Sequence, residues 1–292
     1  MKRLKRYLHS SALLLVAVIW GSGFIATEYA IRSQLGAQAI LAARFAVAAL
    51  AVGLMFFGKI KKAAKREAWH GVLAGALLFL GFLCQTLGQS MTSVSSAAFL
   101  TAANVVMIPF LSWPLLRKRP GGRVIILTVL ALLGIGLIAV RPGETFLLGP
   151  GEGLVLLCAF FFAAHITFLG CACRGDDPAV LTFWQFLSAG MIALATMLFT
   201  GNAPTWPQWH TGLLPVLYLG LFSTCLCYYL QTSAQRHVPP AQAGVLLSTE
   251  GLFGSLFSVW LGLEALRPAM VLGGLLITLC VILMEQKPNK SD

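Results

Sequence analysis

Three polar side chains stand out because each falls inside a long apolar stretch: Arg44, Asn104 and Glu250. A charged group in hydrocarbon costs a few kcal/mol, so such a residue needs a partner, a substrate or an ion. The Glu250 carboxylate can bind a cation or a proton, and the Arg44 guanidinium can bind a carboxylate. The Asn104 amide can both donate and accept hydrogen bonds. These residue types predict non-covalent binding and assign no catalytic residue.

The rest of the chain consists almost entirely of membrane-length apolar segments. Its 292 residues are 58% hydrophobic and 11% charged, whereas soluble domains carry about 25% charged residues. Ten stretches match the length of a helix that crosses a hydrocarbon core ~30 Å thick: 11–31, 37–57, 71–91, 94–115, 123–140, 150–170, 178–199, 211–231, 240–261 and 268–284. The predicted fold class is an all-α membrane protein with ten transmembrane helices. The short loops leave no room for a soluble catalytic or nucleotide-binding domain.

Positive charges are distributed unevenly over the two sides of this predicted membrane protein. Of the 21 Lys and Arg residues, seventeen fall on one side, three on the other and Arg44 within a span. By the positive-inside rule both termini are cytoplasmic, which agrees with an even number of spans. Because the charges lie at helix ends, we expect residues 59–66 to attract anionic lipid and expect no nucleic-acid partner. The expected location is the bacterial inner membrane.

A weak internal repeat divides the chain into two halves, residues 1–145 and 146–292. A shift of 146 residues aligns the fourth and fifth predicted spans with the ninth and tenth, and a shift of 142 aligns the first two with the sixth and seventh. Each half therefore has five spans. Because five is odd, the second half enters the membrane from the opposite side. This inverted repeat predicts alternating access to a central site by rocking of one half against the other.

Asn104 and Glu250 correspond under the shift of 146, and each lies ten residues into its span. At 1.5 Å per residue this depth is about 15 Å, near the bilayer midplane. Two interpretations are open: the side chains line a cavity and bind substrate, or they form hydrogen bonds between helices. In the first, a proton competes with a substrate ammonium for Glu250 and couples transport to protons.

Arg44 lies about seven residues from the outer end of the second span, and Glu28 lies near the outer end of the first. The connection between these spans is short, so Glu28 is the expected counter-ion of Arg44. Two roles are open for this pair: a structural ion pair, or a site at which Arg44 binds a substrate carboxylate. In the second, Glu28 joins Glu250 as a coupling residue.

Aromatic side chains complete the candidate cavity. Trp20 lies in mid-span, whereas most other tryptophans lie near span ends, as in an aromatic belt. The expected lining residues of this kind are Trp20, Phe99, Trp184 and Tyr228. Gln185 and Gln231 are further candidates, although hydrogen bonds between helices explain amides within spans equally well. His165 is expected to be a packing residue.

Four short motifs follow one another along the chain. They lie at residues 20–24 (WGSGF), 44–45 (RF), 95–101 (SSAAFLT) and 261–264 (LGLE). In this order the chain resembles, along its whole length, EamA-type members of the drug/metabolite transporter superfamily. The resemblance implies ten helices around a central cavity and transport of small organic metabolites, often export of amino acids or drugs. Family members usually carry the acidic residue of the last motif in both halves. Here the first-half position is Lys118, which argues against a symmetric role for Glu264.

The leading functional hypothesis is a secondary transporter that exports small metabolites, amino acids with apolar or aromatic side chains first. Such a substrate places its ammonium near Glu250 and its carboxylate toward Arg44. The alternative is a multidrug or cation exporter of the same fold, which needs only the carboxylate. A membrane-embedded enzyme is less favoured, since no paired acid and base and no metal-ligand spacing is visible. No G-x-x-x-x-G-K-[ST] motif occurs, which excludes direct coupling to ATP. We expect no cofactor and no metal.

Overall fold

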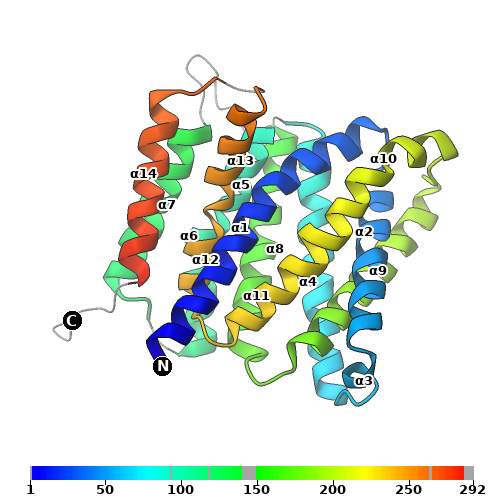
Figure 1. The fold of residues 1–292 in the computed structure, drawn as a ribbon, viewed down its shortest axis with the longest axis horizontal. Helices are drawn as coiled ribbons and strands as arrows, with labels where there is room; N and C mark the ends of the chain where they lie inside the picture. The colour runs from blue at the N-terminus through cyan, green and yellow to red at the C-terminus, as the bar shows by residue number, and fades with distance from the viewer. Residues whose placement is uncertain (1, 93, 118, 140–148, 263–264, 286–292) are drawn as a thin grey trace.

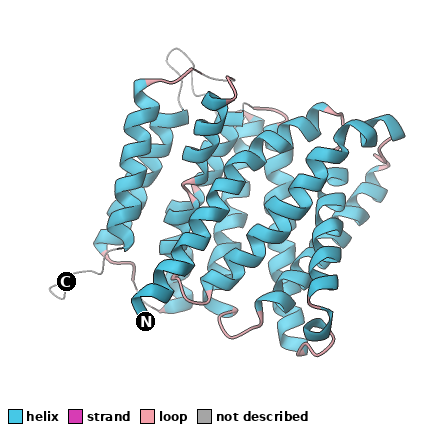
Figure 2. Ribbon diagram, in the orientation of Figure 1, coloured by secondary structure: helices cyan, strands magenta, loops and turns pink. Residues whose placement is uncertain are grey.

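The computed structural model describes residues 2–92, 94–117, 119–139, 149–262 and 265–285. Nearly all of these residues are helical, and the described ranges contain no strand (Figures 1 and 2). Lys118 and Glu264, the two residues at the acidic motif, lie outside them. Helix α1 begins and α14 ends at the same end of the bundle (Figure 1).

The helix bounds fall close to the predicted span bounds, with several subdivisions. In the first half the helices are α1 (Lys2–Arg32), α2 (Ala37–Met55), α3 (Phe57–Ile60), α4 (Lys65–Gln89), α5 (Val94–Ala102), α6 (Asn104–Leu116) and α7 (Gly122–Ala139). In the second half they are α8 (Pro150–Ala172), α9 (Pro178–Thr200), α10 (Trp206–Tyr218), the π-helix η1 (Leu219–Leu226), α11 (Cys227–Gln235), α12 (Pro240–Leu247), α13 (Glu250–Trp260) and α14 (Pro268–Glu285). Four second-half helices begin with proline, whose missing N–H and fixed φ suit the first helical position.

Within the part of the chain that the structure describes, seven helical segments are long and apolar enough to cross a membrane, among them the joined segments Ala97–Leu116 and Trp206–Gln235. Two shorter apolar stretches, Gly122–Leu137 in α7 and Pro268–Met284 in α14, fall below that length. The length and apolar composition of these helices therefore make the protein an integral membrane protein.

Two predicted spans, 94–115 and 240–261, are each divided in the structure. The break at Ala103 separates α5 from α6, and the break at Thr249 separates α12 from α13. At both breaks the backbone N–H bonds the carbonyl three residues earlier, at 3.2 Å for Ala103 and 3.4 Å for Thr249, which tightens the turn as in a 3₁₀-helix. Asn104 and Glu250 consequently begin the second segments, where a continuous helix was expected.

The predicted span 211–231 is helical throughout but changes its winding. Pro215 lies within α10 and has no backbone N–H, so one bond of the α-helix is lost there. The next turns form the π-helix η1, and the N–H of Cys227 bonds back to the carbonyl of Phe222. Such wide turns occur often at functional sites. This one carries Ser223 and Thr224, both of which are buried.

Helices of the two halves interleave. Helix α4 packs along both α8 and α9, α2 packs along α9, and α7 packs along α14. These interfaces between the halves are more extensive than the interfaces within either half. These contacts do not favour two five-helix halves that rock as separate bodies, because α2, α4 and α7 each pack along a helix of the other half.

Helices α1 and α13 lie very close together at Gly21. A Cβ atom built on Gly21 would lie 2.6 Å from the backbone nitrogen of Gly254 and 2.9 Å from Cβ of Phe253. These distances leave no space for a side chain. Glycine at this position therefore allows α13, which carries Glu250, to lie directly against α1.

We expect Gly21→Ala to destabilise the protein by about 1–3 kcal/mol, because the added methyl group forces α1 and α13 apart. Gly58→Ala is the matched control, since a Cβ on Gly58 meets nothing within 4 Å. Melting of the detergent-purified variants provides the measurement. Equal melting temperatures for Gly21→Ala and the wild type would contradict this close packing.

Candidate functional site

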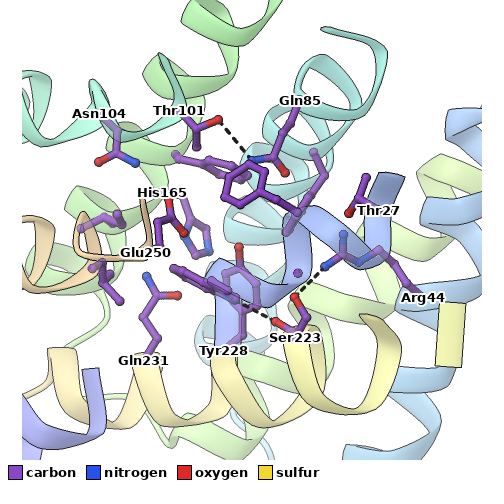
Figure 3. Close-up of a pocket in the computed structure, with 17 residues that line it drawn as sticks. Thr27, Arg44, Gln85, Thr101, Asn104, His165, Ser223, Tyr228, Gln231 and Glu250 are labelled. Atoms are coloured by element: carbon purple, nitrogen blue, oxygen red, sulfur yellow. Dashed lines mark hydrogen bonds between the residues drawn. The ribbon is translucent and has the colours of Figure 1, made fainter. Parts of the chain in front are cut away.

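A buried cavity lies among the helices and contains most of the predicted site residues (Figure 3). Seventeen described residues line it: Trp20, Gly23, Phe24, Thr27, Arg44, Phe82, Gln85, Thr101, Asn104, Phe162, His165, Ile166, Ser223, Tyr228, Gln231, Leu247 and Glu250. Its volume is about 40 Å³, well below the ~150 Å³ of a cavity that accepts benzene. A molecule with an aromatic ring therefore requires a wider conformation.

Glu250 reaches the cavity from the first turn of α13. Its side chain is only 7% exposed, yet the described structure contains no hydrogen bond or ion pair to its carboxylate. A buried charge is normally paired or bound to a ligand. The carboxylate is thus available to a cationic group in the cavity.

Arg44 lies toward the opposite end of the cavity from Glu250 (Figure 3). Its side chain is 2% exposed. The Nε atom donates to Oγ1 of Thr224 at 2.9 Å, and Nη2 donates to Oγ of Ser223 at 3.4 Å. The guanidinium carbon lies 4.0 Å from the ring centre of Phe82, a cation–π contact. These partners are neutral, so the guanidinium retains the capacity to bind an anion.

The expected pair between Arg44 and Glu28 is wrong. Oε1 of Glu28 accepts a bond from Nε of Arg32 at 2.8 Å, one helical turn away on the outer end of α1. The Arg32 side chain in this pair is 71% exposed. Helical spacing brings Glu28 and Arg32 together locally, whereas Arg44 turns toward η1. Glu28 does not line the cavity, so its assignment to coupling has no structural support.

The amides in the cavity differ in their partners. Nε2 of Gln85 donates to Oγ1 of Thr101 at 3.3 Å. Gln231 is fully buried, and neither its Nε2 nor its Oε1 has a hydrogen-bond partner. Leaving a buried polar atom unpaired costs about 1–3 kcal/mol. Asn104, which is 7% exposed, lines the same space. A ligand that satisfies these amides would recover that cost.

Two of the four predicted aromatic residues form part of the wall. Nε1 of Trp20 donates to the carbonyl of Ser223 at 2.8 Å, and the ring centres of Trp20 and Tyr228 are 5.1 Å apart. Among the further aromatic residues of the wall, Phe82 and Phe162 have ring centres 5.1 Å apart. The sequence analysis did not select these two phenylalanines, because their residue type and span position match those of many packing residues.

The other two aromatic predictions, Phe99 and Trp184, do not line the cavity. Phe99 packs with Ala102 and Ile135 in a separate apolar cluster. Trp184 packs against α4, where a Cβ on Gly71 would lie 2.5 Å from the tryptophan Cβ. Both side chains are on helix faces that meet other helices, which explains why they lie outside the cavity.

His165 lines the cavity but also has a local partner. Its Nε2 lies 2.6 Å from Oε1 of Gln185, and its ring meets that of Tyr228 edge-on at 5.7 Å. Gln185 itself does not reach the cavity. The pair fixes the orientation of the imidazole, in keeping with the packing role expected for His165.

The two sequence shifts relate most of the lining residues to one another. Fourteen of the seventeen form seven pairs: Trp20 with Phe162, Gly23 with His165 and Phe24 with Ile166 under the shift of 142, and Phe82 with Tyr228, Gln85 with Gln231, Thr101 with Leu247 and Asn104 with Glu250 under the shift of 146. The remaining three are Thr27, Arg44 and Ser223. Equivalent positions of the two halves thus meet at one cavity.

One cluster outside the cavity has the residue types of a metal site. The ligand atoms of His70, Cys173 and Asp176 lie within 4.8 Å of one another. Arg66 and His70 already occupy the two oxygens of Asp176, at 2.9 and 2.6 Å. Burial, together with the nearby Asp176 carboxylate, raises the pKa of the Cys173 thiol to about 12. We therefore assign the cluster a structural role at the start of α4.

Because Arg44 and Glu28 have separate partners, removing Glu28 should not change the effect of removing Arg44. We expect Arg44→Ala and the double variant Arg44→Ala/Glu28→Ala to melt at the same temperature, because an exposed i,i+4 ion pair contributes only about 0.5 kcal/mol and does not involve Arg44. Thermal unfolding of the purified single and double variants measures the coupling. A double variant clearly more stable than Arg44→Ala would show that Arg44 and Glu28 do form an ion pair in the wild-type protein.

Comparison with known proteins agrees with this architecture. The chain is 32% identical to an uncharacterized transporter of Archaeoglobus fulgidus, over 96% of this chain and 87% of that protein. It is 26% identical to the uncharacterized transporter YwfM of Bacillus subtilis, over 98% and 97%. A shorter match of 104 residues, at 35% identity, is to the aromatic amino acid exporter YddG of Ancylobacter novellus, over 34% of this chain and 33% of that one.

A solved structure titled "Crystal structure of protein" superposes with a TM-score of 0.78 at 14% identity, over 95% of this chain and 96% of that chain. This likeness concerns the fold alone. The family model of the EamA-like transporter family matches twice, at residues 10–140 and 149–285. The chain belongs to the EamA-like transporter family.

Proposed function

We propose that this transporter carries zwitterionic amino acids, apolar or aromatic ones first, out of the cell. The observation that carries the proposal is the presence of two buried, opposite charges in one cavity, neither bound to a group of opposite charge in the described structure. Glu250 has no hydrogen-bond partner there, and Arg44 contacts only the neutral groups of Ser223, Thr224 and aromatic rings. An amino acid provides both missing partners in one molecule.

The binding mode follows from the arrangement of the two charges. Glu250 and Arg44 lie toward opposite ends of the cavity (Figure 3), so the ammonium group faces Glu250 and the carboxylate faces Arg44. The rings of Trp20, Phe82 and Tyr228 lie around the same space and favour an apolar or aromatic side chain. The partial similarity to an aromatic amino acid exporter supports this substrate class and the direction of transport.

The membrane arrangement that fits this function is ten passages in two inverted five-helix repeats, residues 1–145 and 146–292. Three observations support it. The family model matches once in each half, the seven residue pairs meet at one cavity, and the start of α1 and the end of α14 lie at the same end of the bundle (Figure 1). In this arrangement both termini are cytoplasmic and the protein resides in the bacterial inner membrane.

In alternating access, the groups of helices that move as rigid units then contain helices from both halves. The extensive contacts of α4 with α8 and α9 and of α2 with α9 make these four helices one body. The breaks at Ala103 and Thr249 lie directly before Asn104 and Glu250, so bending there changes the cavity itself. Such movement also provides the wider space that an aromatic substrate requires.

The alternative function is export of lipophilic cations by the same fold. It is favoured by a carboxylate without a counter-ion, Glu250, among aromatic rings, since cations bind to ring faces. In this alternative Arg44 takes no part in binding, and its positive charge opposes the ligand. The role of Arg44 therefore separates the two functions.

Competition in proteoliposomes tests the substrate class. We expect phenylalanine to inhibit counterflow of labelled phenylalanine, and we expect phenethylamine, 3-phenylpropionate and tetraphenylphosphonium each to be at least about tenfold weaker, since each lacks one or both charged contacts. Arg44→Gln should abolish the difference between phenylalanine and phenethylamine, while Arg32→Gln, at the exposed outer ion pair, should preserve it. Inhibition by the lipophilic cation, with none by a neutral amino acid, would establish the alternative.

Proton coupling through Glu250 gives a further prediction. If a proton and the substrate ammonium compete for the carboxylate, the apparent KM rises as the pH falls from 8 to 5. Glu250→Gln keeps the shape but cannot exchange a proton, so its transport loses this pH dependence. Glu28→Gln, outside the cavity, is the control and keeps it. If the pH dependence of transport in Glu250→Gln equals that of the wild type, Glu250 is not the group that couples transport to protons.

A further inference from the structure

We propose that Gln231 and Glu250 together form a subsite that selects primary ammonium groups over methylated ones. The inference rests on the proposed function and specifies which cations the site accepts. It makes Gln231, which the sequence left as one of several span amides, a specificity-determining residue that contacts the substrate.

The first observation is the state of the Gln231 amide. The residue lies on α11 and is fully buried. Its Nε2 and Oε1 atoms both lack a hydrogen-bond partner, and the side chain lines the cavity. A buried amide of this kind is retained at a cost in stability unless something else binds it. The cavity that Gln231 lines is a space from which a ligand can do so.

The second observation is the comparison between the two repeats. In the first half, Gln85 has an internal partner, the hydroxyl of Thr101. The counterparts of these residues are Gln231 and Leu247, and leucine offers no hydrogen bond. The second half thus keeps the glutamine but lacks the group that would satisfy it. Such a difference is expected where the partner of the amide is a substrate.

The third observation is the position of the amides around the carboxylate. In Figure 3, Glu250 lies between Asn104 and Gln231, on the side of the cavity opposite Arg44. The carboxylate and the two amide oxygens are all hydrogen-bond acceptors. A primary ammonium has three N–H donors, which matches this set of acceptors. A quaternary ammonium has none, so it would leave Gln231 unsatisfied.

A series of N-methylated ligands tests the proposal directly. Phenylalanine and its N-methyl, N,N-dimethyl and N,N,N-trimethyl derivatives are compared as inhibitors of labelled phenylalanine counterflow in proteoliposomes. For the wild type we expect inhibition to weaken with each methyl group, with a total loss of about 100-fold or more, because each methyl removes a charge-assisted hydrogen bond. The charge and the carboxylate are the same in all four compounds.

The Gln231→Met variant separates hydrogen bonding from size. We expect it to bind phenylalanine about tenfold more weakly, to leave the trimethyl derivative nearly unchanged and so to compress the series. Thr86→Val is the matched control. The hydroxyl of Thr86 is likewise buried without a partner, but it does not line the cavity, so this variant should show the full wild-type series.

The outcomes distinguish the two proposals. If phenylalanine competes but the trimethyl derivative competes equally well, the ammonium subsite is wrong and the amino acid function stands. If the series is steep but identical in Gln231→Met, Gln231 has no part in the selection and the proposal fails. If no amino acid inhibits the wild type, both proposals fail. If Gln231→Met does not fold, Gln231→Leu, which likewise has no hydrogen-bonding group, replaces it with the same expected and contradicting results.

Discussion

The site depends on keeping two opposite charges apart inside an apolar bundle. If Arg44 and Glu250 met, they would form a buried ion pair and leave nothing for a ligand. The fold prevents this by holding Arg44 on the hydroxyls of Ser223 and Thr224, which the π-helix η1 presents. It holds Glu250 at the start of α13, fixed against α1 by the contact at Gly21. A substrate with both charges can bridge them.

The internal repeat supplies a symmetric frame for an asymmetric site. Equivalent positions of the two halves meet around the cavity, but the residues at those positions differ in chemistry. Asn104 faces the space from one half and Glu250 from the other. The counterpart of Arg44 under the shift of 142 is Phe186, which is buried in the apolar core. Although the two halves are related by a repeat, the cavity therefore has one end that suits an ammonium group, at Glu250, and one end that suits a carboxylate, at Arg44.

Much of this site is predictable from sequence, because a polar residue deep in an apolar span stands out against its surroundings. Glu250, Asn104 and Arg44 are predicted in this way, Trp20 and Tyr228 are predicted as aromatic residues within spans, and all five line the cavity. Sequence distance suggested the wrong partner for Arg44, since its true partners are about 180 residues away. Residue type alone could not place Phe99 and Trp184, because neighbouring helices decide which face meets the cavity. The significance of Gln231 emerges only from the structure, which leaves its amide without a partner while its counterpart Gln85 bonds Thr101.

The central claim is that one zwitterion bridges Glu250 and Arg44. A structure of the protein with a bound neutral amino acid tests it most directly. The account predicts density in this cavity, with the ligand ammonium within hydrogen-bond distance of the Glu250 carboxylate and the ligand carboxylate on the Arg44 guanidinium. A ligand bound elsewhere, or one in this cavity with its carboxylate away from Arg44, would contradict the account.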